Sequence, residues 1–444
     1  MDHTRNLIDG RRRFPAMPYE FEVRSPTDGS VVAAVPLSGR HEVARAVEAA
    51  GRAAPGWAAD PKRRALLLGR LVDAVERDAD AMAALQSAET GLAPTDSAAT
   101  VEALLPTARA SARAAGTSPG VTGIVTSWGL PLGEALCAAL PALAAGHTVV
   151  LKPSLRAPLS ASGLAHLAAE LDFPAGVFNL VQGTGVDVGA ALHAHPGLTR
   201  LHVRAGERTL AHAARAVTRA RVFALRAGGN VAVAGPDADP GEVAAAVLGA
   251  LRLHDAGGPL GLPVLAVHAD RWAAVLDAVL HAVADCDPAP LPSEALRERA
   301  LAGIAAARAG GAESVAGGAV PNDAAHRMGW RLPATVLALP GPRLPAGAPP
   351  PGPVLTVFAW RRAADLVGVF SHPRHRDGIA CVWGTAPTAG LPHTVVTHRR
   401  TPVDVLRDAL LPAAWTGRAL PGRAAPRSGC GERRNPVSRG PGSA

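Results

Sequence analysis

The feature that most constrains this chain is a regular alternation of β-rich and helical segments between residues 120 and 225. Strand patterns fall at 120–126, 147–151, 177–181, 201–203 and 222–225, and helical patterns fall at 132–145, 161–171, 186–194 and 208–218. Strand–helix–strand units with short loops place consecutive strands in one parallel sheet. The sequence therefore predicts a doubly wound α/β domain with helices on both faces of the sheet.

Segments on either side of this core extend the fold. Upstream, residues 21–36 predict a β-hairpin, and residues 41–54 and 61–90 predict amphipathic helices. Downstream, helical patterns at 240–253, 272–284 and 293–309 alternate with β-rich runs at 264–267, 354–359 and 379–383. We therefore predict a first domain over residues 1–227, a second α/β domain over 228–416 and a basic, disordered tail over 417–444.

The positive charge of the chain is concentrated in that tail. The net charge is +8, and residues 417–444, with six Arg and one Glu, supply +5 of it. The rest of the chain is nearly balanced, and its basic segments are not interleaved with aromatic residues. We therefore expect no nucleic-acid partner.

Cysteine, histidine and targeting patterns give no further site. The four Cys are far apart, and the 16 His, among them His193, show no metal-ligand spacing and are interpreted as surface residues. We therefore expect no metal. The N-terminus lacks the apolar core of a signal peptide, and the most apolar stretch, 136–151, is too short to span a bilayer. These observations predict a cytoplasmic protein without a membrane partner.

Several motifs occur in an order that points to a known family. They include SPTDGSVVAAVP at 25–36, ETG at 89–91, GIVTSWGLPL at 123–132, PALAAGHTVVLKPS at 141–154 and FPAGVFNLVQGTGVDVG at 173–189. In this order and spacing the chain resembles the aldehyde dehydrogenase superfamily from about residue 6 to 385. The resemblance implies a Rossmann-like domain for NAD or NADP, a catalytic-type α/β domain, an oligomerisation element and a small-molecule aldehyde substrate.

The resemblance also implies a catalytic cysteine, a Glu base and an amide that stabilises the oxyanion. The residues at the matching positions are Leu260, Arg226 and Gly129, respectively. A leucine cannot attack a carbonyl, an arginine stays protonated, and a glycine offers only its backbone N–H. None of the three positions therefore carries the residue type that the family's reaction uses.

Cys137 is the one thiol in a position of interest. It lies in the predicted helix after the Trp128–Pro131 loop, three residues after Glu134, on the side that lines the substrate funnel in this family. A relocated thiol–carboxylate pair is one interpretation, and a small core residue is the other.

The implied cofactor site is preserved only in part. Lys152 matches the family lysine that holds the adenosine ribose, and the other candidate cofactor contacts are Trp128, Ser154, Gly183 and Gly185. The usual acid after the KPS run is Leu155, and the acid that should hold the nicotinamide ribose falls on Pro349. In the loop for the pyrophosphate, Glu207 would compete with a phosphate, whereas Arg204 would attract one.

Two functional hypotheses remain. The first is an aldehyde dehydrogenase-like protein that has lost the thioester chemistry, retains dinucleotide binding, or acts as a partner subunit. It would form homo-oligomers or hetero-oligomers with an active relative, although the segment before residue 120 lacks the hairpin that bridges subunits in this family. The second is an active NAD(P)-dependent oxidoreductase that acts on aldehydes through a non-standard site such as Cys137.

Overall fold

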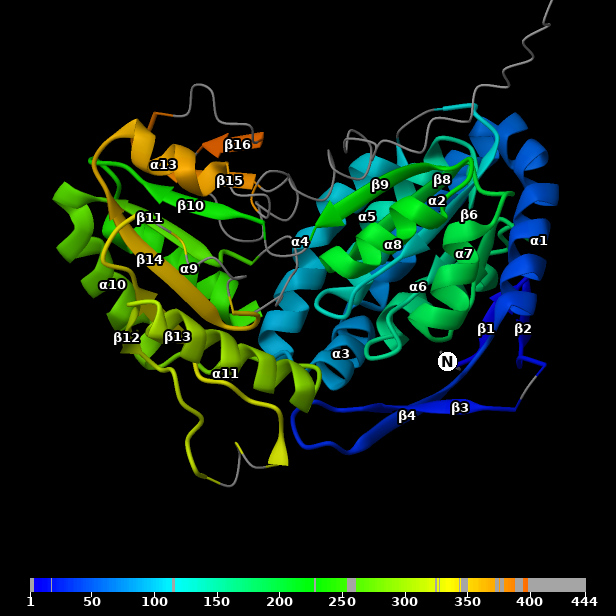
Figure 1. The fold of residues 1–444 in the computed structure, drawn as a ribbon. Helices are drawn as coiled ribbons and strands as arrows, with labels where there is room; N and C mark the ends of the chain where they lie inside the picture. Colours follow the sequence, from blue (N-terminus) through cyan, green and yellow to red (C-terminus); the bar gives the residue numbers. More distant parts are fainter. Residues whose placement is uncertain are drawn as a thin grey trace, which may run out of the picture.

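A computed structural model describes residues 4–16, 18–113, 116–226, 229–253, 261–323, 326, 328–342, 344, 350–371, 375, 379–387 and 394–397. Two seven-stranded sheets, each covered by helices, lie beside one another, and a β-hairpin runs beneath the first of them with its turn reaching the second half (Figure 1). The tail predicted to be disordered lies outside the described residues, as does the boundary predicted at residues 227 and 228.

The first sheet confirms the predicted doubly wound topology. Its strands, in spatial order, are β2 (Arg11–Arg13), β1 (Asn6–Ile8), β7 (Phe178–Leu180), β6 (His147–Lys152), β5 (Gly120–Val125), β8 (Arg200–Ala205) and β9 (Arg221–Arg226). The five strands from β7 to β9 are parallel, whereas β1 and β2 join the edge antiparallel. The chain first builds outward from β5 through β6 to β7 and then returns to place β8 on the other side of β5. The strand order therefore reverses between β5 and β8.

Helices cover both faces of this sheet. The helices of this half are α1 (Arg40–Ala59), α2 (Pro61–Arg77), α3 (Ala79–Thr90), α4 (Pro94–Ala112), α5 (Pro131–Ala144), α6 (Leu159–Glu170), α7 (Ala190–Ala194) and α8 (Glu207–Ala216), with a π-helical turn, η1 (Gly185–Gly189), before α7. Side chains alternate between the faces: Val149 and Leu151 of β6 pack with α2, α4, α5 and α6, whereas Val150 packs with α1, α7 and α8. Burial on both faces explains why these strands are apolar throughout.

Several elements of this half differ from the sequence prediction. The single helix predicted over 61–90 is two helices, because Asp78 leaves helical geometry and serves as the C-cap of α2 and the N-cap of α3. Helix α4 and strands β1 and β2 were not predicted. The three residues of β1 are too few for a period-2 pattern to stand out.

The second sheet confirms the second α/β unit. Its order is β12 (Glu313–Ala316), β13 (Thr335–Ala338), β14 (Val354–Trp360), β11 (Val264–His268), β10 (Val231–Ala234), β15 (Ile379–Trp383) and β16 (Thr394–Thr397), with only β12 antiparallel. Helices α9 (Pro240–Leu253) and α10 (Trp272–Ala284), the latter preceded by the 3₁₀ turn η2 (Ala269–Arg271), pack on one face. Helices α11 (Glu294–Ala309) and α13 (Ala363–Phe370) pack on the other.

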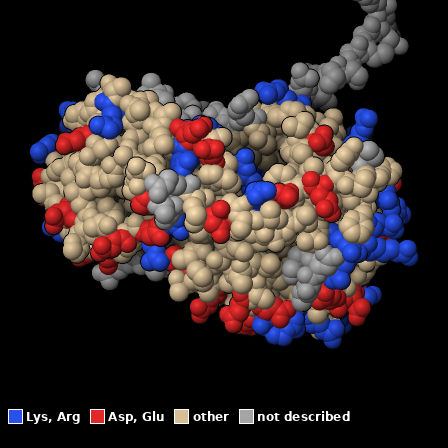
Figure 2. Space-filling view, turned by 90° about the horizontal axis from the view of Figure 1, so that it is seen from below, with Lys and Arg blue, Asp and Glu red and all other residues tan. Residues whose placement is uncertain are grey.

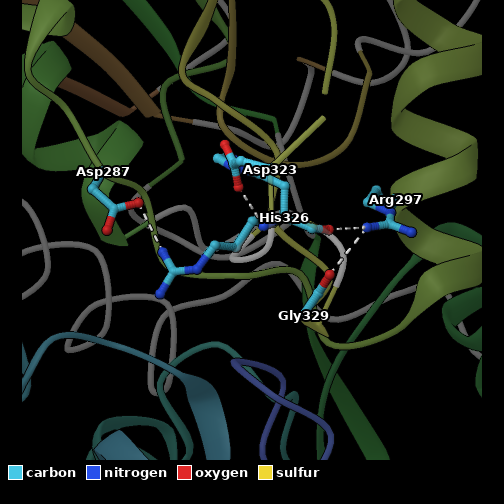
Figure 3. Close-up of polar contacts among 6 residues, drawn as sticks. Asp287, Arg297, Asp323, His326 and Gly329 are labelled. Atoms are coloured by element: carbon cyan, nitrogen blue, oxygen red, sulfur yellow. Dashed lines mark hydrogen bonds and ion pairs between the residues drawn. The ribbon is translucent and has the colours of Figure 1, made fainter. Parts of the chain in front are cut away.

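The predicted N-terminal hairpin, formed by β3 (Glu20–Arg24) and β4 (Val31–Pro36), ties the two halves together. The backbone N–H of Trp330, in the second half, donates to the carbonyl of Pro26 in the hairpin turn at 3.1 Å. Arg297 of α11 braces this segment by donating to the carbonyls of His326 at 3.1 Å and Gly329 at 3.0 Å (Figure 3). The hairpin therefore contacts a loop that is itself fixed to the second half.

Surface features give little further information about function. Acidic and basic side chains are interspersed over much of the face shown in Figure 2, with basic side chains gathered at one side. Within the described ranges, no helix has the length and apolarity needed to cross a membrane, and no cluster of three or more His, Cys, Asp or Glu could hold a metal ion.

Glu89, from the ETG motif, caps helix α6. Its buried carboxylate accepts hydrogen bonds from the backbone N–H groups of Leu159 at 2.5 Å and Ser160 at 3.0 Å, and from the Ser160 hydroxyl at 2.5 Å. These donors are at the start of α6, where backbone N–H groups have no partner within the helix. Burial nevertheless raises the pKa of Glu89 to about 7, against the three hydrogen bonds that lower it.

This pKa predicts a specific pH dependence of stability. Because the folded state holds the Glu89 proton more tightly than the unfolded state, the stabilisation is complete below pH 4.5 and is lost as the pH rises through about 7. Glu89→Gln does not titrate, so the stability of the wild type relative to this variant should fall by up to ~3 kcal/mol across that range. Urea unfolding at several pH values measures the difference, and a constant difference would contradict the assignment.

Candidate functional site

The candidate site lies where the strand order of the first sheet reverses. In doubly wound sheets, ligands bind in the crevice at the carboxyl ends of the strands on either side of such a point. Here those ends are Val125 of β5, followed by the loop into α5, and Ala205 of β8, followed by Gly206 and α8. Side chains from both connections meet there.

A buried ion pair joins these two connections. Arg204, near the end of β8, places Nε 2.9 Å from Oε1 of Glu134 in the first turn of α5, and the two side chains are only 6% and 3% exposed. The backbone N–H of Ser127 donates to Oε2 of Glu134 at 2.5 Å, and the Ser127 hydroxyl donates to Oε1. The sequence left open whether Arg204 would attract a phosphate. In the structure, its partner is the carboxylate of Glu134.

Cys137 lies one turn further along α5, in an apolar environment. Its side chain is 4% exposed, and the residues clustered with it are Leu92, Leu104, Leu130, Leu253 and Ala289. The pKa of the thiol is raised to about 12, chiefly by burial; the charge of Arg204 opposes this shift and the charge of Glu134 adds to it. A thiol in this state is protonated at neutral pH and is a poor nucleophile.

The structure describes only some of the other positions that the family resemblance singled out. Gly129 is buried in the loop between β5 and α5, next to the half-buried Trp128. Arg226 is the last residue of β9, and its side chain is outside the described part of the chain. Leu260 and Pro349 are not among the described residues. Glu207 begins α8 as the sequence predicts, but its side chain is not described either.

Lys152 and its neighbours occupy the carboxyl end of β6. The Lys152 side chain is 5% exposed, and its Nζ donates to the carbonyl of Pro153 at 3.0 Å. Burial lowers the pKa of this lysine to about 8. Ser154 is half-buried and accepts a hydrogen bond from the backbone N–H of Arg156 at 3.3 Å, while Leu155 packs against the hydrophobic cluster of the N-terminal hairpin.

The two predicted glycines have different roles in the turn after β7. Gly183 has φ +153°, and a Cβ there would contact the Val188 side chain and approach the carbonyl of Ser38 to 3.0 Å. No heavy atom lies within 4 Å of a Cβ built on Gly185, which is exposed. The first glycine therefore permits close packing, and the second keeps the surface of the turn open.

His193 was predicted to be a surface residue, and this is wrong. It lies in α7 with 2% of its surface exposed, and neither ring nitrogen has a hydrogen-bond partner among the described residues. The reason is that α7 packs closely against α1 and α8, which a sequence pattern of five residues could not indicate. The same expectation is also wrong for other histidines that the fold buries, namely His147, His166, His202 and His375.

Comparisons with known proteins identify the fold and then the family. A doubly wound domain whose strand order reverses, followed by a second α/β unit, is an arrangement found in proteins that bind nucleotides. Residues 15–370 match the model of the aldehyde dehydrogenase family, and the chain belongs to that family. The predicted membership and fold class are therefore confirmed.

Individual relatives place the chain more closely. It is 36% identical over 251 residues to a 3-succinoylsemialdehyde-pyridine dehydrogenase from a Pseudomonas species, a match that spans 52% of each chain. The chain is thus aligned with about half the length of this curated relative.

Solved structures of the family superpose over much more of the chain. One is aldehyde dehydrogenase C from Pseudomonas syringae in complex with NAD+ and octanal, 28% identical, with a TM-score of 0.77 over 87% of this chain and 86% of that one. Another is a putative aldehyde dehydrogenase from Burkholderia cenocepacia, 24% identical, with a TM-score of 0.79 over 92% and 96% of the two chains. The second likeness concerns the fold alone. Binding of NAD by solved relatives supports NAD(P) binding as a property of the family.

The ion pair predicts a large effect of removing one charge. Arg204→Met leaves the buried Glu134 without this cation and should lower the free energy of unfolding by about 3–5 kcal/mol. The double variant Glu134→Gln/Arg204→Met removes both charges and should recover most of that loss. Urea unfolding measures both.

An exposed ion pair provides the matched control. Arg109, between Asp73 and Glu76, is 37% exposed, so Arg109→Ala should lower the free energy of unfolding far less than Arg204→Met does. A loss for Arg204→Met as small as that for Arg109→Ala would show that the buried pair contributes little.

Proposed function

We propose that this member of the aldehyde dehydrogenase family is a pseudoenzyme for the cysteine-thioester reaction and retains binding of a nucleotide. The observation that carries the proposal is the state of Glu134 and Cys137. The carboxylate of Glu134 is bound to Arg204 and Ser127, and the thiol of Cys137 is buried among apolar side chains. Neither group is free to act as the base or the nucleophile of the alternative, an oxidoreductase that uses Cys137.

The residues at the family's catalytic positions support the same proposal. The reaction needs a thiolate that attacks the aldehyde carbon, an N–H group that stabilises the resulting oxyanion, and a base that activates water. Leu260, Gly129 and Arg226 stand at these positions. Only Gly129 retains part of its role, because a backbone N–H can still donate a hydrogen bond.

Retained nucleotide binding is supported by the carboxyl end of β6 and the turn after β7. Lys152 offers a buried ammonium, Gly183 gives the turn a close packing that a side chain would prevent, and Gly185 leaves the adjacent surface open. Ser154 and Trp128 would complete the contacts to NAD or NADP. A nicotinamide, when bound, supplies a hydride acceptor, and this chain provides no covalent route to it at the family positions.

A role as a partner subunit belongs to the same proposal. Between Gly91 and Gly120 the described residues form α4 and connecting segments without a strand, so the subunit-bridging hairpin expected of the family has no counterpart there. Assembly with an active relative or with itself would therefore use other surfaces, and native mass spectrometry of co-expressed proteins measures it.

The first experiment is an assay for NADH and NADPH formation with aliphatic and aromatic aldehydes. We expect no turnover from the wild type, because no described thiol has an environment that favours the thiolate. Turnover that is lost in Cys137→Ala and kept in Cys286→Ala, a half-buried cysteine of the second half, would overturn the proposal in favour of the alternative.

The second experiment measures nucleotide binding directly. Thermal unfolding with millimolar NAD or NADP should show a rise in Tm of about 2 °C or more, because a ligand that binds only the folded state stabilises it. Lys152→Met should abolish the rise. An unchanged Tm with both nucleotides would show that the binding has been lost as well.

A further inference from the structure

Strand β2 is the outer strand at one end of the first sheet. Its one partner among the described strands is β1, with Arg11 opposite Ile8 and Arg13 opposite Asn6. Figure 1 shows β2 at the margin of the molecule, beside β1. An edge strand presents backbone N–H and C=O groups to which another extended chain can add as a further strand. The outer edge of β2 therefore offers a place for a partner to pair.

The three residues of β2 are all arginines, and they divide between the two faces of the sheet. Because successive side chains of a strand alternate, Arg12 lies on one face and Arg11 and Arg13 lie on the other. The guanidinium of Arg12 donates to Nδ1 of His166 at 3.4 Å and to the carboxylate of Glu170 at 2.8 Å. Within the described ranges, the side chains of Arg11 and Arg13 make no hydrogen bond or ion pair. Two cations on one face of an edge strand thus lack an anionic partner there.

Two carboxylates near this edge already have partners. Asp9, which follows β1, lies 3.4 Å from the guanidinium of Arg52 in α1. Glu42, in the first turn of α1, is buried and accepts a hydrogen bond from the backbone N–H of Ala16 at 3.1 Å. Figure 2 shows basic side chains gathered at the side of the molecule on which α1, β1 and β2 lie in Figure 1. The excess charge at this edge is therefore positive.

Phe14, directly after β2, adds an apolar side chain to the two arginines. It is 62% exposed, and the guanidinium carbon of Arg5 lies 4.4 Å from the centroid of its ring. This cation–π contact favours one position of the ring. Aromatic and arginine side chains contribute more often than others to binding at protein interfaces. We call Arg11, Arg13 and Phe14 the arginine edge.

The charge of the arginine edge limits what can pair with it. A second copy that added its own β2 would place arginine opposite arginine, and like charges in that position are destabilising. Residues 417–444 of this chain, with six Arg and one Glu, have the same sign. Carboxylates two residues apart on an extended chain share one face, as Arg11 and Arg13 do, and each can accept two hydrogen bonds from a guanidinium. The best match is therefore an extended segment with alternate acidic residues.

We propose that the arginine edge is a docking surface for an acidic extended segment of a partner protein, which adds to β2 as a strand and places two carboxylates against Arg11 and Arg13. An apolar side chain of the segment would contact Phe14. A nucleic acid would meet the same charges, but its phosphate backbone has no N–H donors for the carbonyl groups of the strand edge. The inference goes beyond the proposed function and does not depend on nucleotide binding.

The test uses two fluorescein-labelled heptapeptides of the same composition, TVETEVT and TVEETVT, which differ only in the spacing of their glutamates. Fluorescence anisotropy with the full chain should give a Kd for TVETEVT that is about two- to fivefold lower, because only this peptide sets both carboxylates on one face of a strand. Arg11→Gln/Arg13→Gln should make the two affinities equal. Phe14→Ala should weaken the binding of both peptides, and added salt should weaken TVETEVT more than TVEETVT.

The matched control is Lys62→Gln/Arg70→Gln, which removes two exposed cations from α2 and should leave the preference unchanged. A charge reversal tests the contact in the opposite sense: Arg11→Glu/Arg13→Glu should bind TVKTKVT more tightly than TVETEVT. Thermal unfolding shows whether each variant is folded. Absence of binding at millimolar peptide, equal affinities for the two glutamate peptides, or a preference that survives in Arg11→Gln/Arg13→Gln would overturn the proposal. Binding of a single-stranded oligothymidylate that needs Arg11 and Arg13, without binding of TVETEVT, would overturn it in favour of a nucleic acid.

Discussion

The ion pair between Glu134 and Arg204 fixes the side chains at the carboxyl ends of β5 and β8, where the candidate site lies. It links the first turn of α5 to the end of β8, at the point where the order of the first sheet reverses. Two charges at this depth persist only because each compensates the other and Ser127 donates further hydrogen bonds. The carboxylate that a relocated active site would use as a base is thus held in a structural contact, and the thiol beside it remains in an apolar cluster.

The carboxyl edge of the same sheet consequently has two parts with different chemistry. Between β5 and β8 the carboxylate of Glu134 is held by Arg204 and Ser127. Lys152, at the end of β6, and His193, in α7, are also buried, and neither ring nitrogen of His193 has a hydrogen-bond partner among the described residues.

Much of the fold could be predicted from the sequence, and the reasons are local. Strands β5 and β6 carry short apolar runs, and Pro131 marks the start of the connecting helix α5. Strand β1 and the break at Asp78 lack such a signal, because short edge strands and helix ends depend on tertiary neighbours. In the candidate site, Lys152 and Cys137 were found from their motifs, whereas the burial of His193 follows from the packing of α7 against its neighbours.

The sequence by itself determined the family and the doubly wound topology, because motif order and hydrophobic period are properties of the linear chain. Only the tertiary structure decided what the remaining polar residues do. Arg204 and Glu134 are 70 positions apart and become partners through the parallel pairing of β5 with β8. His193 and His212 become neighbours because α7 packs against α8. Distance and burial fix the charge state and the contacts of such groups, and neither is encoded in local sequence.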